Sequence, residues 1–354
     1  MTRQRGERWA WAAAGVGLAG TAVGWSVAPT EFPHAWLAAM TVWLGWPLGC
    51  MGLILVHALT GGRWGHALRP QLVVGMVSLV LLLPALIPLL IVLPALYPWA
   101  RAGAHLENRL YLNLPFFAGR GIVYLLVWFG LGGLILRALR QDLPDAALAR
   151  IAPVGLILLA ITVTYAAIDT TMSLDPQFAS SAYGLIALSQ MGLFALSVSL
   201  FSAAFGPLHD EDTLRSLGKL LLGLVVLWAY LDFMQVLIVW QSDLASEAPW
   251  YIARSAGGWG IAAAAVAGGH FVLPFFALIS PRVQRSRRGI AGVTALLIAS
   301  AVVDGWWLVV PAAGRGLGFV DLLAMLGLLG TAAALALRAS LLPVMAEVLG
   351  GRHA

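Results

Sequence analysis

Ionisable side chains interrupt several of the longest apolar runs in this sequence. Asp169 stands at the end of one run, just before TTMSLDPQFASSAYG (residues 170–184), and Asp232, His270 and Asp304 lie within later runs. Aspartate and histidine exchange protons, and an ionisable group surrounded by apolar residues needs a counter-charge, a polar partner or water. These residue types indicate either buried ion pairs or a path along which protons move.

Helical spacing places further polar side chains beside these groups, because residues three and four positions apart share a helix face. The predicted polar faces are Thr162, Tyr165, Asp169 and Ser173; Arg120, Tyr124 and Trp128; Tyr183 and Gln190; Trp228, Asp232 and Gln235; and Ser300, Asp304 and Trp307.

Two interpretations of these residues stay open. Arg120 can pair with Asp169 or Asp232 and neutralise a buried charge, and Asp175, which precedes Pro176, can shape a turn after its helix. For Asp232 and Asp304, which lie deeper in apolar sequence, a functional role is favoured. The candidates for a proton pathway are Asp169, Asp175, Asp232, His270, Asp304, Arg120, Tyr165 and Gln235.

The composition excludes a soluble globular protein. Of 354 residues, 60% are hydrophobic and only 10% are charged, whereas soluble domains carry about 25% charged residues. The formal net charge of +5 reflects the loops of a membrane protein and not a nucleic-acid partner. The single cysteine, Cys50, lies inside an apolar run and is predicted to be a small core residue.

Apolar runs of this length cross a membrane as helices. We predict an all-α, polytopic membrane protein that forms one integral membrane domain over residues 1–354. Three prolines (Pro84, Pro88 and Pro94) predict a kink in the third span. The ten predicted spans cover about residues 9–28, 35–59, 71–96, 115–138, 149–171, 181–205, 216–240, 256–280, 289–311 and 319–341.

Arginine and lysine gather in alternate connections between these spans. Because cytoplasmic loops are enriched in both residue types, this pattern predicts that both termini are cytoplasmic. It places Arg120, Asp169, Asp232 and Asp304 in the outer half of the membrane and His270 near its middle. Aromatic residues near the span ends, such as Trp250, are expected to anchor the chain at the membrane surface.

No catalytic, cofactor-binding or metal-binding residue is predicted. A membrane haem needs two axial ligands at matching depth, but His57 and His270, the histidines inside predicted spans, differ in depth. Any redox centre is therefore expected in a partner chain.

Five stretches together resemble one known family. They are WPLGCMGLILVHALTGGRWG (46–65), YLNLPFFAGRGIVYL (111–125), IDTTMSLDPQFASSAYG (168–184), LWAYLDFMQVLIVWQSDLASEAPWYIARSAGGWG (227–260) and HFVLPFFAL (270–278). In this order they are similar to a membrane subunit of bacterial alternative complex III, a quinol:cytochrome c oxidoreductase. The protein that they resemble is the smaller of that complex's two polysulfide-reductase-like (NrfD-like) membrane proteins. The resemblance covers about residues 35–282.

The sequence departs from the family pattern at several positions. Met234 stands where a serine is frequent, and Asp243 and Ala245 stand where the family often has Asn-x-Pro. Asp232 occupies a position where a small or apolar residue is expected. The resemblance therefore implies no proton role for Asp232.

The resemblance implies two four-helix bundles with two flanking helices in the bacterial cytoplasmic (inner) membrane. It implies a non-catalytic, cofactor-free subunit of a respiratory or photosynthetic complex. The implied partners are lipids, a multihaem cytochrome c, an iron–sulfur protein and a larger NrfD-like subunit, which hold the c-type haems, the iron–sulfur clusters and the quinol. The proton path proposed for the family maps here onto Asp169, Asp175, His270 and Arg120.

Three functions remain as hypotheses. The leading one is a subunit that anchors the complex and conducts protons across the membrane. The second is a quinol-binding NrfD-like subunit, for which Asp169 with Arg120 supplies the polar groups. The third is a solitary secondary transporter, which inverted repeats and paired broken helices would favour.

Overall fold

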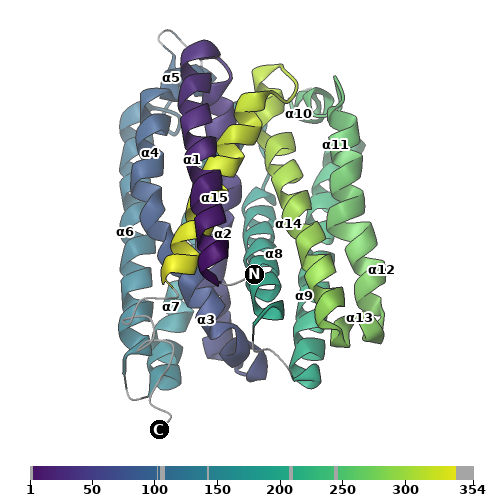
Figure 1. Cartoon of the computed structure of the whole chain (residues 1–354). Helices are drawn as coiled ribbons and strands as arrows, with labels where there is room; N and C mark the ends of the chain where they lie inside the picture. Colours follow the sequence, from purple (N-terminus) through teal and green to yellow (C-terminus); the bar gives the residue numbers. More distant parts are fainter. Residues whose placement is uncertain are drawn as a thin grey trace.

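The computed structural model describes residues 3–101, 103, 108–141, 143–206, 210–242 and 246–339, and this part of the chain contains helices and no strand (Figure 1). Asp243 and Ala245, two of the departures from the family pattern, lie outside the described residues. The elements in chain order are α1 (Arg3–Val27), α2 (Phe32–Thr60), α3 (Arg63–Val77), η1 (Ser78–Leu81), α4 (Leu82–Ile91), α5 (Leu93–Leu96), η2 (Pro98–Ala100), α6 (Leu114–Leu139), α7 (Pro144–Thr170), η3 (Met172–Leu174), α8 (Tyr183–Ala204), α9 (Glu211–Ser242), α10 (Ala248–Ala253), α11 (Trp259–Val266), η4 (Ala267–Val272), α12 (Leu273–Ile279), α13 (Pro281–Arg285), α14 (Arg287–Val309), η5 (Val310–Ala313) and α15 (Phe319–Ala339).

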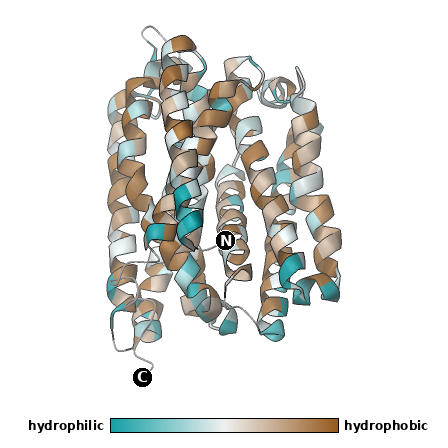
Figure 2. Cartoon of the chain, in the orientation of Figure 1, coloured by the Kyte–Doolittle hydropathy of each residue, from teal (hydrophilic) through white to brown (hydrophobic). Residues whose placement is uncertain are grey.

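Ten helices in the described ranges are long and apolar enough to cross a membrane, which confirms the predicted fold class. Several start or end outside the predicted limits: the third begins at Arg63 and not near residue 71, and the fifth covers Pro144–Leu174 and not 149–171. The helical backbone continues past the hydrocarbon core because its hydrogen bonds do not depend on the apolar side chains from which the limits were predicted. In Figure 2, hydrophobic residues cover the helix bodies and hydrophilic ones concentrate toward the ends.

The spans form two groups of four. One group contains α2, α3 with α4, α6 and α7, in which α2 packs on α3 and α7, and α6 packs on α7. The other contains α8, α9, α11 with α12, and α14. The groups meet where α8 packs on α2 and α7. A Cβ atom at Gly49 of α2 would lie 2.0 Å from the backbone oxygen of Met191 in α8, so only glycine permits this close approach.

The remaining helices, α1 and α15, form an antiparallel pair that lies against α2 (Figure 1). A Cβ atom at Gly17 would lie 2.2 Å from the backbone nitrogen of Gly327, so the two backbones are in direct contact. Arg338 forms an ion pair of 3.6 Å with Glu7, which places the end of α15 beside the start of α1. The opposite end of the molecule carries α10 and the α14–α15 connection and is named the α10 end (Figure 1).

The third crossing is broken, as its prolines predict. A 3₁₀ segment, η1, separates α3 from α4, and Val92 separates α4 from α5. Pro84 and Pro88 lack the N–H groups that would bond to carbonyls one turn earlier, so the α-helical hydrogen-bond pattern changes just before them. This crossing is the most irregular wall of the cavity described next.

Candidate functional site

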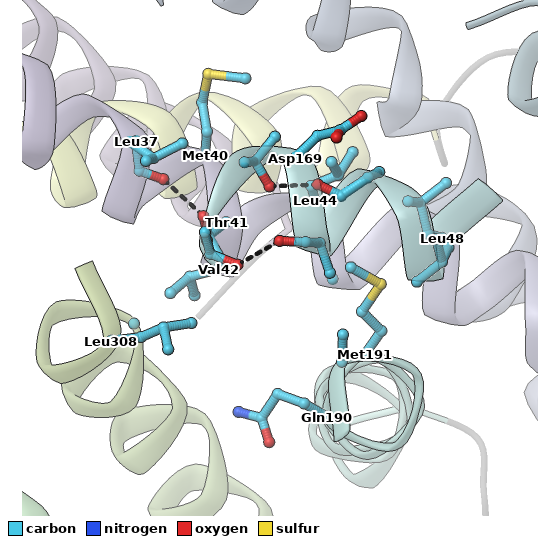
Figure 3. Close-up of a pocket in the computed structure, with 18 of the residues that line it drawn as sticks. Leu37, Met40, Thr41, Val42, Leu44, Leu48, Asp169, Gln190, Met191 and Leu308 are labelled. Carbon is cyan, nitrogen blue, oxygen red and sulfur yellow. Dashed lines mark hydrogen bonds between the residues drawn. The ribbon is translucent and has the colours of Figure 1, made fainter. Parts of the chain in front are cut away.

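A cavity of about 580 Å³ lies between the two groups of helices. Its walls come from α2, α4, α6, α7, α8, α9, α10 and α14 and are mostly aliphatic and aromatic. Figure 3 shows Gln190 and Met191 extending from α8 near the space that Leu308 of α14 borders. Binding sites for small molecules have this size and an apolar lining with a few convergent polar groups.

Two carboxylates face this cavity. Asp232 of α9 and Asp304 of α14 both line it, and they are close enough to interact electrostatically. The amide Nε2 of Gln190 donates a hydrogen bond of 3.2 Å to Asp304. Within the described part of the chain, neither carboxylate forms an ion pair and Asp232 has no hydrogen-bond partner. Each acid belongs to a polar helix face that the sequence predicts, and in the structure both acids line the cavity.

A second polar group lies next to Asp232 along α9. Gln235 is buried, its Oε1 accepts a hydrogen bond of 2.6 Å from the Ser180 hydroxyl, and its Nε2 donates one of 2.9 Å to the Tyr251 hydroxyl. Burial raises the pKa of Tyr251 to about 12, so this phenol is neutral at physiological pH. Because its oxygen accepts from Gln235, its proton is free to be donated to a molecule in the cavity.

Asp169 also borders the cavity, but its charge is neutralised. The Nε and Nη2 atoms of Arg120 each donate a hydrogen bond of 2.8 Å to its carboxylate, and the Tyr124 hydroxyl donates another of 2.7 Å. Arg120 lies 3.8 Å from the centre of the Tyr111 ring and donates to the Tyr111 carbonyl at 3.0 Å. The predicted pairing of Arg120 with a buried aspartate is confirmed, and the partner is Asp169 and not Asp232.

His270 is buried behind the cavity wall. It lies in the π-helical segment η4, and its ring centre is 4.3 Å from that of Trp228, which lines the cavity. Neither ring nitrogen has a hydrogen-bond partner in the described part of the chain. His270 does not line the cavity, and the structure does not place it in the same polar cluster as the carboxylates.

Two other predicted residues lie away from the cluster. Tyr165 is 46% exposed on the surface of α7, so its predicted inward orientation is wrong; Thr162, on the expected face, is buried and accepts a hydrogen bond from Trp128. Residues three positions apart on a helix are offset by about 60° around its axis, so Tyr165 lies at the edge of the face that Thr162 occupies. Asp175 accepts a hydrogen bond of 3.1 Å from the backbone N–H of Gln177, which confirms its turn-shaping role.

The structure adds a buried arginine at the α10 end. Arg254 is 2% exposed, stacks 3.2 Å from the centre of the Trp250 ring, and donates hydrogen bonds to the carbonyls of Trp250 and Leu308. Burial lowers its pKa to about 10, so it remains a cation at neutral pH. Trp250 is itself 2% exposed and stacks on Phe178, so its predicted role as a membrane anchor is wrong.

These contacts fasten α10 across the cavity. Arg254 bonds to α14 through Leu308, and Trp307 of α14 donates a hydrogen bond of 2.9 Å back to the Arg254 carbonyl. Arg254 lies between the predicted spans 216–240 and 256–280, and no predicted polar face includes it. The only available signal was its spacing of one helical turn from Trp250, which allows the arginine to reach that residue's carbonyl.

No protein-family model and no curated protein matches this sequence. Within the described residues, no group of three or more His, Cys, Asp or Glu side chains comes together to hold a metal ion. The polar groups that line the cavity include the carboxylates of Asp232 and Asp304, the phenol of Tyr251 and the amides of Gln190 and Gln235.

Proposed function

We propose that this chain is a membrane subunit of a quinol-oxidising electron-transfer complex and that its cavity binds the quinol. The observation that carries this proposal is the pair Asp232 and Asp304, which face a largely apolar cavity of about 580 Å³ without a neutralising cation in the described part of the chain. A quinol combines an apolar body with two hydroxyl groups. Such a cavity offers the body an apolar wall and the hydroxyls two acceptors.

The carboxylates suit the chemistry of quinol oxidation. Conversion of a quinol to a quinone releases two protons and two electrons. Asp232 and Asp304 accept the protons, and the Gln190 amide holds the second carboxylate in place. The electrons pass to a redox centre of a partner chain, an iron–sulfur or haem protein, which takes up one electron at a time.

Among the hypotheses from sequence, this geometry favours the quinol-binding alternative, with Asp232 and Asp304 in place of Asp169 and Arg120 as the polar contacts. Asp169 with Arg120 was the expected quinol contact, but that carboxylate already accepts bonds from Arg120 and Tyr124. Asp232 and Asp304 retain free acceptor positions. By the distribution of arginine and lysine, the α10 end faces outward in the bacterial inner membrane, so the protons leave on that side.

Photolabelling of the purified complex tests this proposal. A photoreactive quinone analogue is expected to label peptides of α8, α9 and α14, and excess quinol is expected to suppress the labelling. Asp232→Asn with Asp304→Asn removes the proton acceptors and weakens binding about tenfold or more, the effect of losing a hydrogen bond to a charged group. Asp145→Asn, at an exposed site paired with Arg69, is the matched control. Equal labelling of all variants would overturn the proposal.

Transmembrane proton conduction is a second candidate, favoured by the unpartnered nitrogens of His270 beside Trp228. If this chain conducts protons, Asp304→Asn and His270→Gln are expected to reduce the number of protons moved per electron while the complex still assembles. Co-purification separates both candidates from a solitary transporter. A subunit of the proposed complex is isolated with haem-bearing partners, whereas a transporter is isolated alone.

A further inference from the structure

One wall of the cavity is also part of the outer surface. Leu90 of α4 and Ile122 of α6 line the cavity, yet each is 59% exposed. Leu114, at the start of α6, lines it as well and is 45% exposed. A side chain that contacts both the cavity and the exterior marks the place where the wall between them is incomplete.

The packing of the two helices accounts for this opening. α4 packs on α2 and α6 packs on α7, while the described residues show no extended contact between α4 and α6. The α4 segment is short and bounded by η1 and by the break at Val92, so it does not continue as a straight neighbour of α6. The proline-interrupted crossing therefore leaves a slot where a regular helix would close the bundle.

Small residues widen the slot on the α6 side. Ala118 and Gly121 both line the cavity, and a Cβ atom at Gly121 would meet no other atom within 4 Å. The slot is flanked by leucine, isoleucine and phenylalanine. The carboxylates without an ion pair in the described residues, Asp232 and Asp304, line the cavity from α9 and α14, whereas Asp169 of α7 is paired with Arg120 of α6.

We propose that the slot between α4 and α6 is a lateral portal, through which the ligand enters head-first from the hydrocarbon of the membrane. This inference rests on the proposed function and specifies its substrate class: a quinol with a long hydrocarbon chain. The head reaches Asp232 and Asp304, and the chain remains in the portal against Leu90 and Ile122. A water-soluble ligand has no need of an opening at this depth, because lipid covers it.

Two variants of α6 test the portal. Gly121→Leu places a side chain in the slot, and Gly119→Leu, two positions away, places the same side chain where a Cβ also meets nothing within 4 Å but does not line the cavity. Both positions have open space around an added Cβ atom, so both variants are expected to fold. Leu90→Trp closes the slot independently from the α4 side.

The first probe is a photoreactive hydrocarbon, dissolved in the bilayer of nanodiscs that contain the full-length protein. If the portal is open, this probe labels the cavity residue Met191. Labelling of Met191 is expected to be several-fold lower in Gly121→Leu and Leu90→Trp and unchanged in Gly119→Leu. The second probe is the photoreactive quinone with a long chain, whose labelling falls in the same variants.

The two probes separate this inference from the proposed function. Hydrocarbon labelling of Met191 that Gly121→Leu blocks, without quinone labelling of any variant, supports the portal and overturns the quinol. Quinone labelling that is equal in Gly121→Leu, Leu90→Trp and Gly119→Leu overturns the portal and leaves the quinol site in place. Absence of hydrocarbon labelling at Met191 in the unmodified protein also overturns the portal.

Discussion

Three acidic residues in the described part of the chain line the cavity: Asp169, Asp232 and Asp304. Removing the charge of Asp169 is expected to destabilise the fold more than removing the charge of either of the others. The side chains of Asp169 and Arg120 are 2% and 11% exposed, and the carboxylate accepts three hydrogen bonds of 2.7–2.8 Å. Asp169→Asn keeps the shape but leaves the Arg120 cation buried without its counter-charge. Breaking a buried pair from one side costs about 3–5 kcal/mol, so we expect a loss of that size in the free energy of unfolding.

Unfolding of the purified protein in mixed micelles, followed by tryptophan fluorescence, measures this loss. Asp232→Asn is the matched control, because Asp232 lines the same cavity without an ion pair in the described part of the chain. Its amide is expected to change stability little or to raise it. The double variant Arg120→Met with Asp169→Leu removes both charges and is expected to recover much of the loss. If Asp169→Asn and Asp232→Asn have equal stability, the ion-pair reasoning is refuted.

Three further predictions concern packing and charge elsewhere in the fold. Gly17→Ala pushes a methyl group into the backbone of α15 and is expected to lower the free energy of unfolding by about 1–3 kcal/mol. Gly15→Ala adds a methyl group that meets no atom within 4 Å and is expected to raise the free energy of unfolding by about 0.5–1 kcal/mol. Chemical unfolding of the two variants measures both changes. Arg254→Gln loses the hydrogen bond from the arginine to Leu308 of α14 and the one to the carbonyl of Trp250 in α10. It is expected to lower the free energy of unfolding by about 1–3 kcal/mol and to raise protease cleavage at α10. Hydrogen bonds from Thr213 lower the pKa of Asp210, so its stabilising effect is present above the usual aspartate pKa and is lost as pH falls through the lowered value. Melting temperatures measured at decreasing pH are expected to show this loss in the native protein and not in Asp210→Asn.

The sequence could predict the helices because the membrane imposes them. Every backbone polar group within the hydrocarbon must be satisfied inside its own helix, so runs of apolar residues determine both the number and the type of elements. The same logic predicted the inward face of α9, where Trp228, Asp232 and Gln235 all line the cavity. The break near Pro84 follows equally from local chemistry, because proline lacks an N–H group.

Relations between helices could not be predicted in this way. Arg120 had two acceptable partners at similar depth, and the choice of Asp169 over Asp232 depends on how α6 and α7 rotate and pack. Tyr165 was misplaced because it lies at the margin of the polar face, where a small rotation decides between the interior and lipid. The burial of Arg254 was not predicted, because it depends on how the connection between two spans packs against the other helices.

The membrane charges of this protein divide into two classes by what surrounds them. A charged residue within a membrane-spanning helix costs about 2.5–3.5 kcal/mol on insertion scales. The hydrogen bonds from Arg120 and Tyr124 to Asp169 offset this cost, so a structural role accounts for this carboxylate. Asp232 and Asp304 have no such cation in the described residues and face a largely apolar cavity. Packing alone would be served better by leucine at both positions, so their presence argues for a ligand or proton that the paired Asp169 cannot serve.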